Sequence, residues 1–319
     1  TQVKCSYFTG NLSAHDSKRR FGFELTFFRI ALAPPMGRST TVESEWAADQ
    51  LYMAHFALTD AGPARFHFAD RLTRGAAGLA GATAEPLRIW NETWSAESLP
   101  SETPSPIDGA FPVRLRARDG DVAIELEVSP TQPMVLHGDR GYSRKGDDPG
   151  MASHYYSYVR LAATGTVEAA GESIAASGTA WMDHEWSTSV LGDALLGWDW
   201  FALQLDDRSE WMLFELRDRQ GHRGAWSQGT IARSDGSVHS ITGDRFTIEV
   251  TDRWTSPATS RTYPAGWRVR IPEEDRTLDV RPVLADQELR LTTTYWEGAV
   301  DVLESGRVIG RGYVELVGY

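Results

Sequence analysis

Short runs rich in β-branched and aromatic residues follow one another along the whole chain, and this pattern limits the fold more than any other feature. Gly, Pro, Asp and Ser bound the runs, several of which alternate between apolar and polar residues. In the first half they span residues 21–30, 52–60, 65–70, 122–128 and 154–167, and after residue 198 the same rhythm continues. Helical periodicity is scarce, with short helix candidates only at 47–52 and after Pro282. The pattern therefore predicts an all-β protein of barrel or sandwich type.

The two halves of the chain resemble each other. YFTGNL (7–12) followed by FGFELTFFR (21–29) matches WFALQL (200–205) followed by EWMLFELR (210–217), and segment 154–182 matches segment 294–316. In both of the last two segments an aromatic pair opens a strand, a Gly turn follows, and the final strand begins with Gly. Because each copy starts and ends alike, the repeat predicts two similar antiparallel β-barrels in tandem, residues 1–190 and 191–319.

Composition narrows the class of partner. Twelve Trp among 319 residues favour a large cavity with aromatic walls, because indoles often line pockets. The formal net charge of −12 offers no electrostatic match to nucleic acid or to an anionic membrane surface. The absence of a run of about 20 apolar residues predicts no membrane-spanning helix. We therefore expect an apolar small-molecule partner, while the sequence leaves the oligomeric state open.

The number of cysteines and the first residue of the chain are the two features that could indicate the cellular compartment. The lone cysteine, Cys5, excludes an internal disulfide and a cysteine metal cage. The chain begins at Thr1 rather than Met, which fits removal of an upstream segment such as an export signal. Neither observation decides between an exported and an intracellular protein.

The segment GTAWMDHEWSTS (178–189) carries three adjacent ionisable residues among large apolar ones. On a strand, Trp181, Asp183 and Glu185 share one face, and Met182, His184 and Trp186 share the other. Val314 and Leu316 read as the inward positions of the second copy, so by the same register His184 points into the first barrel. The two carboxylates then point outward, into the contact between the barrels. Aligning Gly178 with Gly312 places Val317 opposite Asp183, so the ionisable triplet belongs to the first copy alone.

The side chains of this segment suit a reaction that passes through a carbocation. Two nearby carboxyls in an apolar site cannot both ionise cheaply, so the pKa of one rises and it becomes a proton donor near pH 7. Indole faces stabilise a neighbouring cation, and four indoles lie within twenty residues: Trp181, Trp186, Trp198 and Trp200. Hydration or isomerisation of an alkene fits this combination. The alternative is structural, with the carboxylates paired to arginine and His184 a satisfied core histidine.

Other candidates are less specific. Tyr155 and Tyr156 open the strand that leads to the triplet, and one of them should face inward with a hydrogen-bond partner. His55 alternates with aromatic residues and could line a cavity. The residues of metal-ligand type (His137, His154, His184, Asp183 and Glu185) lack HExxH or regular spacing, so no metal site is predicted. GxSxG and a phosphate-binding Gly-rich loop are absent, which leaves esterase and nucleotide chemistry without support.

Two irregular stretches are predicted to be long surface loops and candidate lids. Residues 96–109 are rich in Pro and Ser, and residues 138–151 are charged and rich in Gly. Loops of this length in a compact protein are often functional.

Taken together, these motifs resemble the AttH-like/carotenoid 1,2-hydratase family, over nearly the whole chain. AWMDHEW followed by GWDWF is the most specific part of the match. The resemblance implies two lipocalin-like barrels in tandem, and a family that includes kievitone hydratase and is related to certain cyclases. Its hydratases add water to a prenyl double bond without a cofactor, and its Asp-His motif falls on Asp183 and His184. Many members read EWWYFTG near the start, whereas this chain has Cys5 and Ser6 where Trp is expected.

The sequence therefore predicts a cofactor-free hydratase acting on an alkene of an isoprenoid or polyene-like substrate. Asp183 is expected to protonate the alkene. Glu185 would keep the pKa of Asp183 high or position water, and His184 would orient the pair or accept the proton of water. Trp181, Trp186, Trp198 and Trp200 would surround the cation, with Tyr155, Tyr156 and His55 as further substrate contacts. A lipocalin-type carrier of apolar ligands and a cyclase of the same fold are the alternatives.

Overall fold

The computed structural model describes residues 3–32, 48–100, 105, 107–148, 150–187 and 195–319. Over these residues the protein is all-β, with two 3-10 turns, η2 (Gly243–Arg245) and η3 (Pro272–Glu274), as the only helical elements. Two short helix predictions were wrong where they can be compared: residues 50–52 open strand β3, and the segment after Pro282 is an irregular connection. No helix in the described part of the chain is long and apolar enough to span a membrane.

The first antiparallel sheet has the strand order β4-β3-β2-β1-β13-β12-β9-β8-β7-β6-β5, and β10 and β11 add to β12. Its strands are β1 (Val3–Ala14), β2 (Arg20–Ala31), β3 (Gln50–Asp60), β4 (Arg65–Arg74), β5 (Ala80–Thr83), β6 (Arg88–Asn91), β7 (Trp94–Ser98), β8 (Val113–Asp119), β9 (Val122–Pro130), β10 (Val135–Leu136), β11 (Tyr142–Arg144), β12 (Ala152–Ala169) and β13 (Glu172–Ser187).

The second antiparallel sheet has the order β17-β16-β15-β14-β23-β22-β20-β19-β18, and β21 adds to β22. Its strands are β14 (Leu195–Leu205), β15 (Glu210–Asp218), β16 (Gln228–Ala232), β17 (Val238–Thr242), β18 (Thr247–Thr255), β19 (Thr262–Ile271), β20 (Arg276–Pro282), β21 (Glu288–Arg290), β22 (Thr294–Glu304) and β23 (Arg307–Val317).

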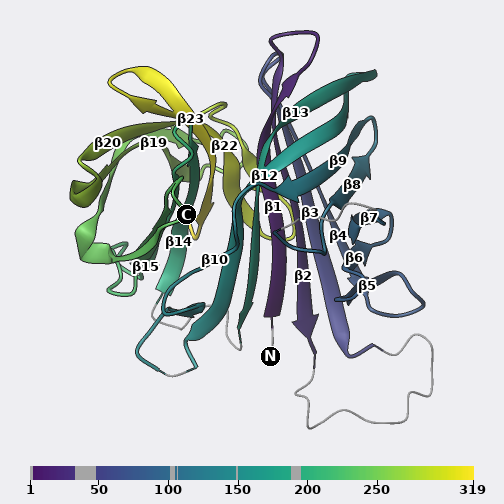
Figure 1. The fold of residues 1–319 in the computed structure, drawn as a ribbon, viewed down its shortest axis with the longest axis horizontal. Helices are drawn as coiled ribbons and strands as arrows, with labels where there is room; N and C mark the ends of the chain where they lie inside the picture. The colour runs from purple at the N-terminus through teal and green to yellow at the C-terminus, as the bar shows by residue number, and fades with distance from the viewer. Residues whose placement is uncertain (1–2, 33–47, 101–104, 106, 149, 188–194) are drawn as a thin grey trace.

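The two sheets curl into two barrels in tandem, as the repeat predicted, and these are lipocalin-like, as the family resemblance implied. In Figure 1 the second sheet, green to yellow, forms a nearly closed barrel, and the first forms a more open half-barrel beside it. The predicted domain boundary at residue 190 lies outside the described residues, between the end of β13 at Ser187 and the start of β14 at Leu195. The division at residue 190 therefore stays a prediction.

The central strands are buried on both faces because the barrels pack against each other along them. One apolar core fills the first sheet's concave side, around Phe8, Leu25 and Met182, and another fills the second barrel. A third core lies between the sheets and includes Tyr155 and Trp200. This double burial explains why β1 and β14 contain continuous runs of buried residues rather than an alternation of buried and exposed ones.

The strand registers change the alignment of the two copies. Across β1 and β13, Tyr7 pairs with Asp183, and across β14 and β23, Trp200 pairs with Glu315. Since YFTGNL matches WFALQL, Tyr7 corresponds to Trp200, and the counterpart of Asp183 is therefore Glu315 rather than Val317.

Strands β12 and β22 support the same correspondence. Ser157 pairs with Asp183, and Glu297 pairs with Glu315, as expected if the aromatic pairs that open the two strands are equivalent. The alignment of Gly178 with Gly312 was wrong by two residues. A shift of two keeps every side chain on its face and still places a glycine, Gly310, opposite Gly178, so the sequence pattern did not reveal the error.

Candidate active site between the barrels

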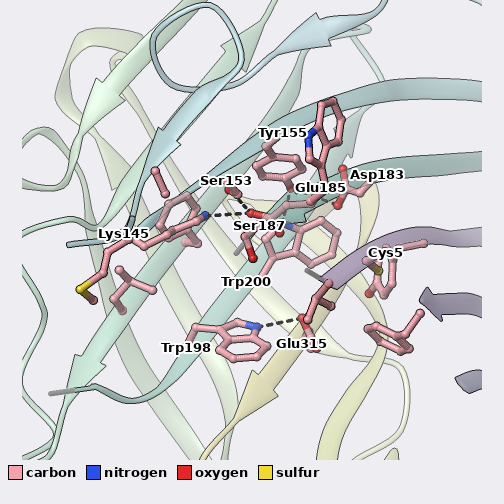
Figure 2. Close-up of a pocket in the computed structure, with 18 residues that line it drawn as sticks. Cys5, Lys145, Ser153, Tyr155, Asp183, Glu185, Ser187, Trp198, Trp200 and Glu315 are labelled. Atoms are coloured by element: carbon pink, nitrogen blue, oxygen red, sulfur yellow. Dashed lines mark hydrogen bonds and ion pairs between the residues drawn. The ribbon is translucent and has the colours of Figure 1, made fainter. Parts of the chain in front are cut away.

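A cavity of about 200 Å³ lies between the two sheets. Strands β1, β2, β12 and β13 of the first sheet and β14, β15 and β23 of the second contribute to its wall. Most of the wall is apolar and includes Phe28, Trp198, Trp200, Phe214 and Leu216. One ammonium group, Lys145, and three carboxyl groups, Asp183, Glu185 and Glu315, interrupt it, as Figure 2 shows.

Asp183 is held at this cavity by three hydrogen bonds. Oδ1 accepts from the Ser157 hydroxyl and from Trp181 Nε1–H at 2.7 Å, and Oδ2 accepts from the Tyr155 hydroxyl at 3.0 Å. Burial raises the pKa of Asp183 to about 7, although the three hydrogen bonds favour the charged form and oppose the rise. Because each carboxyl oxygen offers about two acceptor positions, Oδ1 is fully used, and a proton on Asp183 belongs on Oδ2.

A buried histidine extends this network away from the cavity. His137 Nε2 lies 2.6 Å from Ser157 Oγ, and its Nδ1 lies 2.9 Å from Thr230 Oγ1 on the second barrel. Burial lowers the pKa of His137 to about 3, so the ring is neutral. While Ser157 gives its single proton to Asp183, His137 must donate through Nε2 and accept from Thr230. The sequence drew attention to His137 only as a possible metal ligand.

Tyr155 ties the first barrel to the second at this site. Trp200 Nε1–H donates to the Tyr155 hydroxyl at 3.0 Å, and the Trp200 ring meets the ring of Tyr7 edge-on at 5.3 Å. The Tyr155 hydroxyl donates its own hydrogen bond to Asp183. The phenol therefore accepts a hydrogen bond from the second barrel and donates one within the first. Burial and the nearby carboxylates raise the pKa of Tyr155 well above its usual value, which keeps it a donor.

Glu185 belongs to the polar rim of the cavity. It is half-buried, accepts a hydrogen bond from Ser153, and lies 3.4 Å from Lys145 Nζ. The Lys145 ammonium also lies 3.8 Å from the centre of the Phe214 ring. Lys145 comes from the segment 138–151, so a predicted surface loop supplies the cation of the site. Strand β11 occupies part of this segment.

Glu315 on β23 is a residue of the cavity that the sequence did not single out. Its Oε2 accepts a hydrogen bond from Trp198 Nε1–H at 2.9 Å. Desolvation raises the pKa of Glu315 to about 7, opposed by the Trp198 hydrogen bond and reinforced by the negative charges of Glu185 and Asp183. The signal that could have found it is the repeat itself, aligned by strand register.

The sequence-predicted residues divide into two groups. Asp183 and Glu185 line the cavity together with four aromatic residues: Tyr155, Trp186, Trp198 and Trp200. Trp181 touches the site through its hydrogen bond to Asp183 rather than through the cavity wall.

Three predicted residues lie away from the cavity wall. His184 is on the opposite face of β13, as alternation predicted, with Nδ1 2.9 Å from Ser6 Oγ and its ring against Tyr156. Tyr156 packs against the core of the first barrel. His55 is buried at the barrel contact, with Nδ1 2.7 Å from the Tyr295 hydroxyl. A direct role of these three side chains at the reacting atoms has no support in this geometry, because a strand sends adjacent residues to opposite faces.

Among the described residues, no group of three or more His, Cys, Asp or Glu side chains is arranged to hold a metal ion. The donors at Asp183 are all N–H or O–H groups of neighbouring side chains. The chemistry available from these residues is proton transfer at carboxyl groups in an aromatic cavity.

Comparisons with known proteins agree on the family and the fold. The AttH-like family model matches residues 2–319. An AttH from Nitrosomonas europaea is 30% identical and superposes with a TM-score of 0.85, covering 100% of this chain and 93% of its own. No curated protein matches the chain in sequence.

Two more distant solved structures are similar in fold. Kievitone hydratase from Nectria haematococca is 13% identical with a TM-score of 0.73, covering 98% of this chain and 88% of its own. CghA, solved with Sch210972, is 14% identical with a TM-score of 0.58, covering 100% of this chain and 88% of its own.

Proposed function

This chain belongs to the AttH-like family, and from that premise we propose that it is a cofactor-free hydratase or hydro-lyase. Its substrate would carry an alkene on an isoprenoid or polyene-like apolar skeleton. The observation that carries the proposal is the Asp183 carboxyl, buried, with its pKa raised to about 7, and facing a cavity with aromatic walls. Half of such carboxyl groups hold a proton at neutral pH, which is the condition for a general acid.

The acid step uses the network around Asp183. The proton on Oδ2 goes to an alkene carbon, and a carboxylate remains. Hydrogen bonds from Ser157, Trp181 and Tyr155 are already directed at that carboxylate, so they stabilise the charge that forms without reorganising. Glu185 adds negative charge nearby and helps to keep the pKa of Asp183 high.

The aromatic wall suits the carbocation that results. Trp198, Trp200 and Phe214 line the same cavity, and aromatic faces attract a cation through their quadrupole, by about 0.5–2 kcal/mol each. An apolar wall also accepts the hydrocarbon part of an isoprenoid and limits the amount of water that reaches the cation. The fold shared with kievitone hydratase supports the same class of reaction.

Incubation with 2-(3-methylbut-2-enyl)phenol and mass spectrometry of the products test this proposal. Wild-type protein should convert the alkene to the tertiary alcohol, one water heavier, or the alcohol to the alkene. Asp183→Asn keeps the shape and loses the proton, so turnover should fall by about 10³-fold. Thermal unfolding of the variant checks that it is folded. A folded Asp183→Asn protein that still hydrates the alkene at the wild-type rate contradicts the mechanism.

The apolar cavity wall also supports a second candidate, a lipocalin-type carrier of an apolar ligand. A cyclase of this fold would use the same wall to fold a polyene. A carrier should bind the prenylphenol without product, and a cyclase should keep its turnover when Asp183 is replaced by Asn. Binding measured by quenching of tryptophan fluorescence, beside the product assay, separates the three.

A further inference from the structure

We infer that Glu315 is the second catalytic carboxyl of this site. It is the base that takes the proton of the attacking water, while Asp183 gives its proton to the alkene carbon. This inference rests on the proposed function. It adds to that function a residue from the second barrel and a division of labour between two carboxyl groups.

Asp183 and Glu315 are equivalent positions of the two barrels. Asp183 and Glu315 occupy matching places on the last strands of the two copies, paired with Tyr7 and Trp200 respectively. Each accepts a hydrogen bond from an indole N–H, Asp183 from Trp181 at 2.7 Å and Glu315 from Trp198 at 2.9 Å. The tandem arrangement thus brings one carboxyl from each barrel to a single cavity.

One carboxyl oxygen of Glu315 is available to a ligand. Oε2 accepts from Trp198, and Oε1 makes no hydrogen bond with any of the described residues, although the side chain lines the cavity. An oxygen of this kind can accept a hydrogen bond from a water held in the cavity. Its negative charge is available when a proton must be removed.

Glu185, the other carboxyl of the cavity, already has polar partners. Glu185 accepts a hydrogen bond from Ser153 and is paired with Lys145 at 3.4 Å, toward the rim. Among the described residues, the Lys145 ammonium and the Ser153 hydroxyl thus already contact Glu185, whereas a single indole donor contacts Glu315. Positioning of water, which the sequence assigned to Glu185, is therefore better served by Glu315.

The step balances as an addition of water. The Asp183 proton forms a new C–H bond as the π bond breaks, and the more substituted carbon becomes a cation. The water oxygen forms a C–O bond to that cation, and its proton passes to Glu315. Asp183 ends as a carboxylate and Glu315 as a neutral acid, and one proton returns between them through the product hydroxyl or water. In the reverse direction Glu315 protonates the leaving hydroxyl and Asp183 takes the proton from carbon.

Deuterium separates the two roles. In D₂O, Asp183 delivers deuterium to the alkene, and a cation that returns to alkene by losing hydrogen leaves deuterium in the recovered substrate. The experiment compares wild type, Asp183→Asn, Glu315→Gln and Glu315→Asp with 2-(3-methylbut-2-enyl)phenol. It measures the alcohol formed and the deuterium in the recovered alkene by mass spectrometry.

Glu288→Gln is the matched control. It makes the same substitution at a fully buried glutamate of the second barrel, whose partners Ser256 and Thr259 lie outside the cavity wall. Its hydration rate should stay within about threefold of wild type.

We expect Glu315→Gln to lose hydration by about 100-fold while it retains deuterium exchange, and Glu315→Asp to recover part of the hydration. Asp183→Asn should lose both. Wild-type hydration by Glu315→Gln overturns the assignment of Glu315, and so does an equal loss of hydration and exchange, which indicates a structural role. A wild-type protein that neither hydrates nor exchanges the alkene overturns the proposed function itself, and the assignment with it.

Discussion

Two groups of carboxyls lie at the contact between the barrels, and they differ in one respect. Asp183 and Glu315 line an open cavity, whereas Glu24 on β2 and Glu297 on β22 are sealed, with at most 1% of either exposed. Burial raises the pKa in both groups, to about 7 for Asp183 and to about 8 for Glu24. A raised pKa alone therefore does not mark a reactive site. Space for a substrate beside the carboxyl distinguishes the two.

The sealed pair is held by phenols from both barrels. Tyr7 donates to Glu297, and Tyr295 donates to Glu24 at 3.3 Å while it also meets His55. Burial raises the pKa of both carboxyls, and for Glu297 the negative charge of Glu24 reinforces the rise. This pair joins the barrels, and the cavity pair is free to exchange protons with a ligand.

The largest effect expected from this comparison is on turnover. Asp183→Asn should lose hydration of the prenylphenol by about 10³-fold, whereas Glu24→Gln should stay within about threefold of wild type, because a sealed carboxyl reaches no substrate. The rate of alcohol formation at saturating alkene measures both. A Glu24→Gln protein as inactive as Asp183→Asn, yet folded, would break the distinction between the two groups.

The next effect concerns stability and pH. The pKa of Glu24 is raised in the folded protein, so the folded state holds a proton that the unfolded chain releases. Stability is therefore complete below the ordinary pKa of a glutamate and is lost as pH rises toward about 8, at about 1.4 kcal/mol per pH unit for one proton.

Glu297→Gln tests this sign. The pKa of Glu297 is itself raised by burial, so the neutral amide removes one carboxyl that holds a proton in the folded state, and the decline in stability above pH 5 should become shallower. Urea unfolding of wild type and variant at several pH values between 5 and 8 measures the free energy of unfolding. Parallel curves for the two proteins would mean that the pair does not store a proton.

A smaller effect is expected at His184, which lies beside Asp183 in sequence but on the opposite face. His184→Gln should retain hydration within about threefold, because the ring packs inside the first barrel against Tyr156. The variant should instead lose about 1 kcal/mol of stability through the contact with Ser6. Steady-state rates and urea unfolding measure the two quantities. A loss of turnover as large as that of Asp183→Asn would show that His184 takes part in the reaction.

The smallest effect is expected at the rim. Lys145→Met removes the partner of Glu185, a half-exposed pair worth less than about 1 kcal/mol. The unpaired charge of Glu185 then raises the pKa of Asp183 further, since Glu185 already acts in that direction. The pH–rate profile should shift toward higher pH by less than about one unit. A shift toward lower pH would contradict this reading of the rim.

The sequence predicted the fold well because the strand pattern and the internal repeat are global signals. Alternation also placed Asp183 and His184 on opposite faces of β13 correctly, since a strand has a period of two. It could not detect the shift of two residues that hid Glu315, because such a shift preserves every face.

Contacts between segments far apart in the chain could not be predicted from local sequence patterns. Lys145 reaches the cavity from an irregular segment, and Ser157 and His137 join Asp183 only through pairing and packing. The helix predicted at 47–52 was wrong because residues 50–52 are the first residues of β3. Their pairing with β2 outweighs a weak local helical preference.

The central claim is that Asp183 carries an exchangeable proton near neutral pH and faces the cavity. The indole N–H of Trp181 donates to Asp183, so its ¹⁵N–¹H NMR signal reports the charge on that carboxyl directly. We predict that this signal titrates with a midpoint near pH 7, in line with the raised pKa of Asp183, that the titration disappears in Asp183→Asn, and that the prenylphenol shifts it. A signal that stays constant from pH 5 to 9 and ignores the ligand would contradict the account.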